Sequence, residues 1–207
     1  MTDFTHKLTP VIKPGSDRHK EMIGWRHQIH AHPELAYMEQ KTSDLIAKKL
    51  TQWGVEYTRN WAETGIMARI KGQAGEGPTI ALRADMDALP IIEENDVNYK
   101  SQNEGVMHAC GHDGHTATLL AAAKYLSETR NFDGTVHLFF QPAEETGQGA
   151  MQMIEHGVLK NPEVDAIFGY HNMPGAPIGV VTTRKGCLLA GADFFTITVT
   201  GKGGHGA

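Results

Sequence analysis

The sequence has few cysteines, no long apolar run and no excess of positive charge. Only two cysteines occur in 207 residues, which argues against a disulfide framework and favours a reducing compartment. The first residues lack the basic start and apolar core of a signal peptide, and no run of about 18 apolar residues occurs. We therefore expect a cytoplasmic protein without a membrane partner.

Positive charge is outnumbered by negative charge. The 19 Lys and Arg against 24 Asp and Glu give a net charge of -5, and the positive residues are scattered along the chain. Such a chain lacks the basic stripe that binds nucleic acid, so no nucleic-acid partner is expected. The 40% hydrophobic content is enough to bury one good core and part of a second.

Apolar residues recur with helical and strand periods along the chain. After an arm over residues 1–15, the patterns predict helices at 16–30, 42–53, 115–129 and 148–157. They predict strands at 65–70, 79–84, 135–140, 165–170, 179–183 and 193–200. Strands that alternate with helices indicate an α/β fold, with a sheet covered by helices.

The densest group of potential metal ligands lies at residues 108–115, which read His-Ala-Cys-Gly-His-Asp-Gly-His. Thiolate and imidazole are usual ligands of zinc and similar divalent metals. Cys110 and His112 are two residues apart, so an extended or turn backbone can direct both at one point. The alternative is a purely structural role, in which the histidines lie in a polar turn by chance and Cys110 is a small buried apolar residue. We favour a metal site.

Ionisable side chains follow three of the expected strands. They are Asp85 and Asp87 after residues 79–84, Glu144 and Glu145 after residues 135–140, and His171 after residues 165–170. Open α/β sheets bind ligands beyond the carboxyl ends of their strands, so we expect these groups to converge with the turn at 108–115. The combined set offers four metal ligands: Cys110, His112, Glu145 and His171.

The two adjacent glutamates are expected to have different roles. In an extended stretch, neighbouring side chains point to opposite sides, so one binds metal while the other faces the substrate. Glu144 is then the general base that takes a proton from an activated water and returns it to the leaving amine. The alternative is a solvated turn over residues 144–146 that opens the next helix, where acidic residues are favoured.

At these residues the chain resembles the metal-dependent aminoacylase and hippurate hydrolase family, the amidohydrolase branch of the carboxypeptidase-like co-catalytic zinc metallopeptidases. The matching blocks, in family order, lie at residues 26–35, 81–90, 108–116, 140–145 and 169–171. The resemblance implies a zinc-exopeptidase-like mixed sheet with helices on both faces. It also implies two divalent metal ions, with zinc favoured over manganese, cobalt or nickel.

The resemblance also assigns roles by position. The implied metal ligands are Cys110, His112, Glu145 and His171. Glu144 is implied as the general base, and Asp87 as the acid that supports the site from behind the ligands. Asp85 stands where the peptidase branch has a metal-binding histidine, and Cys110 is expected to take over that duty.

Family members are longer than this chain, with a lid and dimerisation domain inserted into the catalytic domain. By this resemblance, residues 1–190 form the catalytic metal-binding domain, and residues 191–207 the first strand and turn of an α+β lid domain. His205 in that turn is expected to bind substrate. A last metal-binding histidine is expected beyond Ala207, so we expect the chain to be a fragment of a homodimeric enzyme.

The predicted function is metal-dependent hydrolysis of the amide bond of small N-acyl amino acids. Hippurate-like or N-acetyl conjugates would yield a carboxylic acid and a free amino acid. A dipeptidase or carboxypeptidase of the same superfamily is the first alternative, although the spacing of Cys110 and His112 favours the amidohydrolase branch. An inactive, truncated metal-binding fragment is the alternative outside the enzymes.

Overall fold

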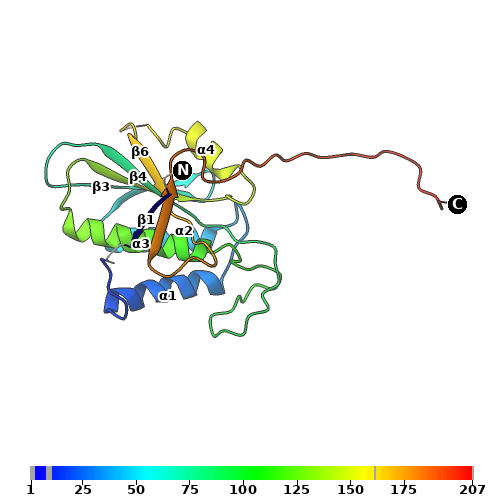
Figure 1. Cartoon of the computed structure of the whole chain (residues 1–207), viewed down its shortest axis with the longest axis horizontal. Helices are drawn as coiled ribbons and strands as arrows, with labels where there is room; N and C mark the ends of the chain where they lie inside the picture. The colour runs from blue at the N-terminus through cyan, green and yellow to red at the C-terminus, as the bar shows by residue number, and fades with distance from the viewer. Residues whose placement is uncertain (1–2, 8–10, 161, 207) are drawn as a thin grey trace. The chain divides into compact units, whose positions relative to one another are not determined.

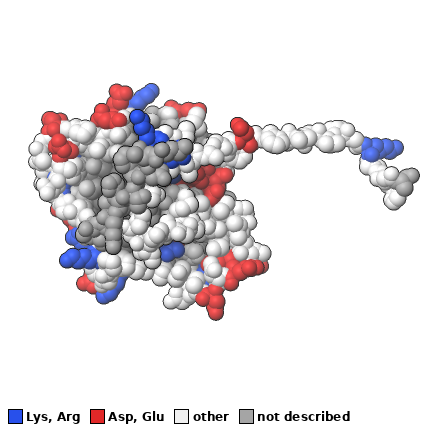
Figure 2. All heavy atoms as spheres, viewed as in Figure 1, with Lys and Arg blue, Asp and Glu red and all other residues white. Residues whose placement is uncertain are grey.

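The computed structural model describes residues 3–7, 11–160 and 162–206. The chain divides into two compact units, of which the larger is Ile12–Pro174 and the smaller combines Met1–Val11 with Gly175–Ala207. Within the described ranges, no helix is both long and apolar enough to cross a membrane. On the face shown in Figure 2, Lys and Arg side chains are separated by acidic and uncharged residues.

The larger unit is built on a five-stranded mixed sheet with the order β2-β3-β5-β4-β6. Its strands are β2 (Glu56–Trp61), β3 (Gly65–Lys71), β4 (Thr79–Asp85), β5 (Thr135–Gln141) and β6 (Ala166–Gly169). The pairs β2–β3 and β3–β5 are antiparallel, whereas β5–β4 and β4–β6 are parallel. Three neighbouring strands therefore end at the same edge of the sheet (Figure 1).

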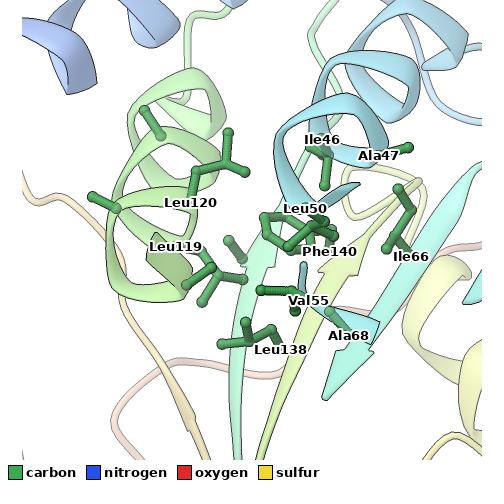
Figure 3. Packing of buried hydrophobic residues seen from close by; sticks show 14 of the residues in the cluster. Ile46, Ala47, Leu50, Val55, Ile66, Ala68, Leu119, Leu120, Leu138 and Phe140 are labelled. Atoms are coloured by element: carbon green, nitrogen blue, oxygen red, sulfur yellow. The ribbon is translucent and has the colours of Figure 1, made fainter. Parts of the chain in front are cut away.

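Helices cover both faces of this sheet (Figure 1). They are α1 (Asp17–Ala31), α2 (Gln40–Gln52), α3 (His112–Thr129) and α4 (Gly149–Glu155). Alternate residues of a strand point to opposite faces. Leu138 and Phe140 of β5 accordingly pack with α2 and α3 in the main core (Figure 3), whereas Phe139 packs with Met153 of α4 in a second cluster.

The main core forms because the apolar stripes of α2 and α3 meet a continuous apolar strand. Ile46 and Leu50 of α2 and Leu120 of α3 are 0% exposed, as is Phe140 of β5. Burial of each such side chain stabilises the fold by about 1.5–3 kcal/mol. This packing fixes the N-terminus of α3 against the sheet edge where β4 and β5 end.

Most of the predicted elements are confirmed. The expected mixed α/β architecture, the four helices, the strands now named β3 to β6 and the strand predicted at 179–183 are present within a few residues. The main shift in a boundary is at α3, which begins at His112 rather than at residue 115, so that His112 and Asp113 lie in its first turn.

Three predictions from the sequence were wrong. β2 was not predicted, because the hairpin that joins it to β3 turns through two positive-φ residues, Ala62 and Glu63, instead of through glycine. The arm at residues 1–15 contains β1 (Asp3–Lys7), which pairs antiparallel with β7 (Val180–Arg184) in the smaller unit. The strand expected at 193–200 is absent, since described residues 185–206 contain no strand or helix.

Candidate metal centre

The carboxyl ends of β4, β5 and β6 bring the predicted site residues together. Asp85 ends β4 opposite Gln141, which ends β5. His171 follows the end of β6 by two residues. The N-terminus of α3 lies at the same edge, where the Thr116 hydroxyl donates a hydrogen bond to the Asp85 carbonyl at 2.8 Å. The expected convergence of strand ends is therefore present in the structure.

Three groups of potential metal ligands occur at this edge, and His112 belongs to all of them. In each group the ligand atoms lie within 4.8 Å of one another. The groups are Cys110 with His112 and His171, His112 with Glu144 and Glu145, and Asp85 with His112 and His115. One imidazole therefore lies where a thiol, a second imidazole and several carboxylates meet.

His112 has the features expected of a metal ligand. It is 0% exposed, and within the described part of the chain neither of its ring nitrogens has a hydrogen-bond partner. Nε2 lies 3.8 Å from Glu145 Oε1, another buried atom without a partner there, and 3.9 Å from Glu144 Oε2. Buried polar atoms are nearly always paired. A cation between these groups would satisfy them all, so the donor set fits a divalent metal.

Cys110 and His171 form the thiol side of the site. Cys110 Sγ lies 3.4 Å from His171 Nε2. His171 Nδ1 donates to the Asn172 carbonyl oxygen at 2.7 Å, which leaves the lone pair of Nε2 facing the thiol. Burial, followed by the nearby Glu145 and Asp85 carboxylates, raises the pKa of Cys110 to about 11. A bound cation would reverse that effect, because metal coordination deprotonates a thiol.

Asp87 holds the backbone of the turn that carries Glu144 and Glu145. Its Oδ1 and Oδ2 accept hydrogen bonds from the backbone N–H groups of Glu144 and Glu145, each at 3.0 Å. Oδ1 also lies 3.4 Å from His112 Nδ1. Burial alone would raise the pKa of Asp87, but the close His112 ring and the two amides lower it. The contacts suit the supporting role predicted for this acid, while none of them places it as a ligand.

Asp85 already has two cationic or donor partners. Arg83 approaches Oδ2 at 2.7 Å, and His115 Nδ1 donates to Oδ1 at 2.6 Å. Although burial opposes it, the His115 hydrogen bond and the Arg83 charge lower the pKa of Asp85 to about 2. His115 Nε2 in turn accepts the backbone N–H of Asn172 at 3.0 Å. Asp85 and His115 therefore tie β4 to the loop that carries His171.

The geometry of the two adjacent glutamates differs from the expectation. They lie in a turn rather than in an extended stretch, so their side chains do not point to opposite sides. Both approach Nε2 of His112 within 4 Å. They differ instead in exposure, because the Glu144 side chain is 39% exposed and that of Glu145 is 25% exposed. Burial raises the pKa of Glu145.

Two buried networks beside the site were not predicted. His30 is not among the site residues predicted from the sequence, yet its Nδ1 lies 2.9 Å from Asp113 Oδ2 and its Nε2 3.1 Å from Glu93 Oε1. Glu39, 0% exposed, accepts the Ala143 N–H at 2.9 Å and the Thr64 hydroxyl at 2.6 Å. Nothing in the spacing of the sequence links these partners, because they meet only through the fold.

His205 lies in the smaller unit, where it is exposed. Its predicted contact with substrate stays a prediction, as does the domain boundary at residue 190.

Known proteins resemble this chain over most of its length. Residues 81–204 match peptidase family M20/M25/M40. The chain is 47% identical over 182 residues to the hippurate hydrolase of Campylobacter jejuni, a match that covers 88% of this chain and 47% of that enzyme. It is also 47% identical over 209 residues to thermostable carboxypeptidase 2 of Saccharolobus solfataricus, covering 99% of this chain and 52% of the relative.

A solved structure supports the fold. The chain is similar, with a TM-score of 0.74 and 43% sequence identity, to a dinuclear metal-binding peptidase of the M20 family from Bacillus subtilis. That match covers 78% of this chain and 45% of the solved chain. The chain thus spans about half the length of the relatives that it matches.

Proposed function

This chain belongs to peptidase family M20/M25/M40, and on that premise we propose that it carries the metal centre of an amidohydrolase. The reaction is hydrolysis of the amide bond of N-acyl amino acids, hippurate-like or N-acetyl conjugates, to a carboxylic acid and a free amino acid. The observation that carries the proposal is the buried His112, whose ring nitrogens have no hydrogen-bond partner among the described residues and which lies among a thiol, an imidazole and two glutamates.

The proposed ligands are Cys110, His112, Glu145 and His171. They supply soft, intermediate and hard donors, a set that suits zinc and also manganese, cobalt or nickel. We propose two divalent ions with zinc as the resident metal, in keeping with the dinuclear relative. Such a pair would lower the pKa of a water molecule and polarise the scissile carbonyl.

Glu144 is the proposed general base. Its side chain is the more exposed of the two glutamates, so it can reach a substrate while Glu145 faces the buried ligands. Asp87 accepts a hydrogen bond from the Glu144 backbone N–H. This bond fixes the position of the Glu144 backbone, from which the side chain extends. From there Glu144 would take a proton from water and deliver it to the leaving nitrogen, a step worth typically 10²–10⁴-fold in rate.

The substrate class follows from the hippurate hydrolase relative and from the Cys110 and His112 spacing. A carboxypeptidase activity is the second candidate, because the relative from Saccharolobus solfataricus carries that name. Assays with N-benzoylglycine and with a peptide of similar size, run side by side, distinguish the two. Substrate binding by His205, a homodimer and a cytoplasmic location belong to the same proposal.

The experiment that tests the proposal is substitution of Glu144 by Gln in the metal-loaded chain. We expect Glu144→Gln to retain its metal by elemental analysis and to lose hippurate hydrolysis by about 10²–10⁴-fold. Glu155→Gln changes an exposed glutamate at the end of α4 and serves as the control. Unchanged turnover in Glu144→Gln would exclude it as the base. A zinc-loaded wild-type chain that releases no amine would instead support the non-catalytic metal-binding alternative.

A further inference from the structure

Three consecutive backbone N–H groups in the turn after β5 donate to buried carboxylates. The Ala143 amide donates to Glu39 Oε1 at 2.9 Å. The Glu144 and Glu145 amides donate to the two oxygens of Asp87 at 3.0 Å. Glu39 is 0% exposed and Asp87 is 1% exposed, so water does not compete for either acceptor.

The backbone of this turn is unfavourable on its own. Ala143 has a φ of +50°, in the left-handed region that costs a residue with a side chain about 1–2 kcal/mol. A left-handed residue of this kind lets successive N–H groups point to one side and form a concavity for anions. Glu39 and Asp87 accept the three N–H groups of this turn and so stabilise its left-handed conformation.

Among the described residues, the Glu39 side chain neither caps a helix nor forms an ion pair. It is the N-cap residue of α2, but its side chain makes no capping hydrogen bond. No Lys, Arg or His among the described residues forms an ion pair with it. Its second oxygen accepts the Thr64 hydroxyl at 2.6 Å, which orients the carboxylate toward Ala143. Burying a carboxyl group is costly unless its hydrogen bonds are made.

We infer that Glu39 is a positioning residue, which fixes the Ala143 amide and thereby holds Glu144 and Glu145 in place. The inference rests on the proposed function, because that function makes Glu145 a ligand and Glu144 the base. Among the described residues, the Glu39 carboxylate hydrogen-bonds Ala143 and Thr64 and none of the four proposed metal ligands. It acts from α2 on a turn 104 residues away in the sequence.

The test compares Glu39→Ala and Glu39→Gln with Glu34→Ala. Glu34 is a matched control, because its carboxylate likewise accepts backbone amides, those of Lys41 and Thr42 in α2 at 2.9 Å, but does not reach the turn. Two readouts are made on the full chain. Hydrogen exchange of the amides of residues 143–145 is followed without metal, and the zinc dissociation constant is measured by titration.

For Glu39→Ala we expect amide exchange in residues 143–145 to accelerate at least about tenfold. The zinc dissociation constant is expected to rise about 10–100-fold, as for other residues that orient metal ligands. Glu39→Gln keeps an acceptor for Ala143 and a partner for Thr64, so it should preserve most of both. Glu34→Ala should lower overall stability and leave the turn unchanged.

Results that differ from these expectations would overturn either the role of Glu39 or the proposed function. Unchanged exchange at residues 143–145 in a folded Glu39→Ala chain would overturn the inference. Equal losses in Glu39→Gln and Glu39→Ala would overturn it as well, because charge rather than hydrogen-bond geometry would then be at work. A wild-type chain that binds no zinc would overturn the proposed function, while the exchange data would still decide the role of Glu39.

Discussion

His112 is the imidazole shared by all three candidate ligand groups, and its setting is made by residues from three separate elements. Asp87 approaches one ring nitrogen, and Glu144 and Glu145 approach the other. The ring is fully buried, so its orientation is fixed by packing as well as by charge. A change at one ligand therefore acts on a site whose other members are already in position.

Replacing Cys110 by Ser should lower the metal content of the protein. A hydroxyl is a far weaker ligand for zinc than a thiolate, so we expect a substantial loss of bound zinc by elemental analysis after dialysis. Cys187→Ser is the control, because Cys187 is exposed and lies in the smaller unit. Equal zinc in the two variants would remove Cys110 from the proposed ligands.

His137 should make the stability of the protein depend on pH. It is 0% exposed in β5, and among the described residues neither ring nitrogen has a hydrogen-bond partner. Burial, and then the Arg69 charge, lower its pKa from 6.5. The folded state therefore binds a proton less readily than the unfolded state, and stability falls as the pH drops below about 6.5.

The variant His137→Leu should flatten that dependence. We expect the loss of unfolding free energy between pH 7 and pH 5 to shrink by about 1 kcal/mol, measured by urea denaturation at each pH. His156→Leu provides the comparison, because His156 is exposed at the end of α4. The same pH slope in wild type and His137→Leu would show that this ring is accommodated without penalty.

At the scale of elements, the start of α3 determines how Cys110 and His112 face one another. Gly111 lies between them at a φ of +93° and forms the N-cap of the helix. A side chain there would overlap the Asn172 side chain. The glycine therefore permits both the left-handed turn and the close approach of the loop that carries His171.

Gly111→Ala should destabilise the protein more than Gly105→Ala does. Both positions have positive φ, so each substitution adds strain of about 1–2 kcal/mol. Gly105 has open space around it, whereas a Cβ at 111 must displace Asn172. We expect the urea midpoint to fall further in Gly111→Ala than in Gly105→Ala, and zinc binding to weaken in Gly111→Ala alone. Equal losses in both variants would mean that the contact with Asn172 is easily relieved.

The sequence could predict those elements whose residue pattern is contained in one short stretch of the chain. β4 and β5 are mostly apolar segments followed by acids, and the ligand candidates at 108–115 are adjacent in the chain. β2 could not be predicted, because its hairpin turn lacks the usual glycine. Glu39 could not be predicted either, since its partner Ala143 is brought to it only by the packing of α2 against the sheet. The predicted strand at 193–200 had apolar alternation but has no paired strand among the described residues.

At the scale of the whole molecule, the proposed centre would join parts that the fold holds by packing alone. Cys110 and His112 lie at the start of α3, Glu145 lies after β5, and His171 lies after β6. A metal bound at these four residues would link the three segments of the larger unit. The link exists only in the folded state, because the ligands are far apart in the sequence.

Zinc should therefore raise the melting temperature. A ligand at 100 times its dissociation constant adds about 2.7 kcal/mol of stability, which for a domain of this size is roughly 5–10 °C. Scanning calorimetry with zinc, and again after a chelator is added, measures the effect. Magnesium should give a smaller shift, because it prefers oxygen ligands. Identical melting temperatures with zinc and with chelator would contradict a site formed by the fold.

The turn at residues 143–145 also limits where an oxyanion can be stabilised. In many hydrolases, backbone N–H groups form an oxyanion hole for the charge that develops on the carbonyl oxygen. Here the three amides already donate to Glu39 and Asp87. This turn therefore offers a substrate its glutamate side chains and none of these amides. Negative charge on a tetrahedral intermediate beside this turn must be balanced by groups other than these three amides.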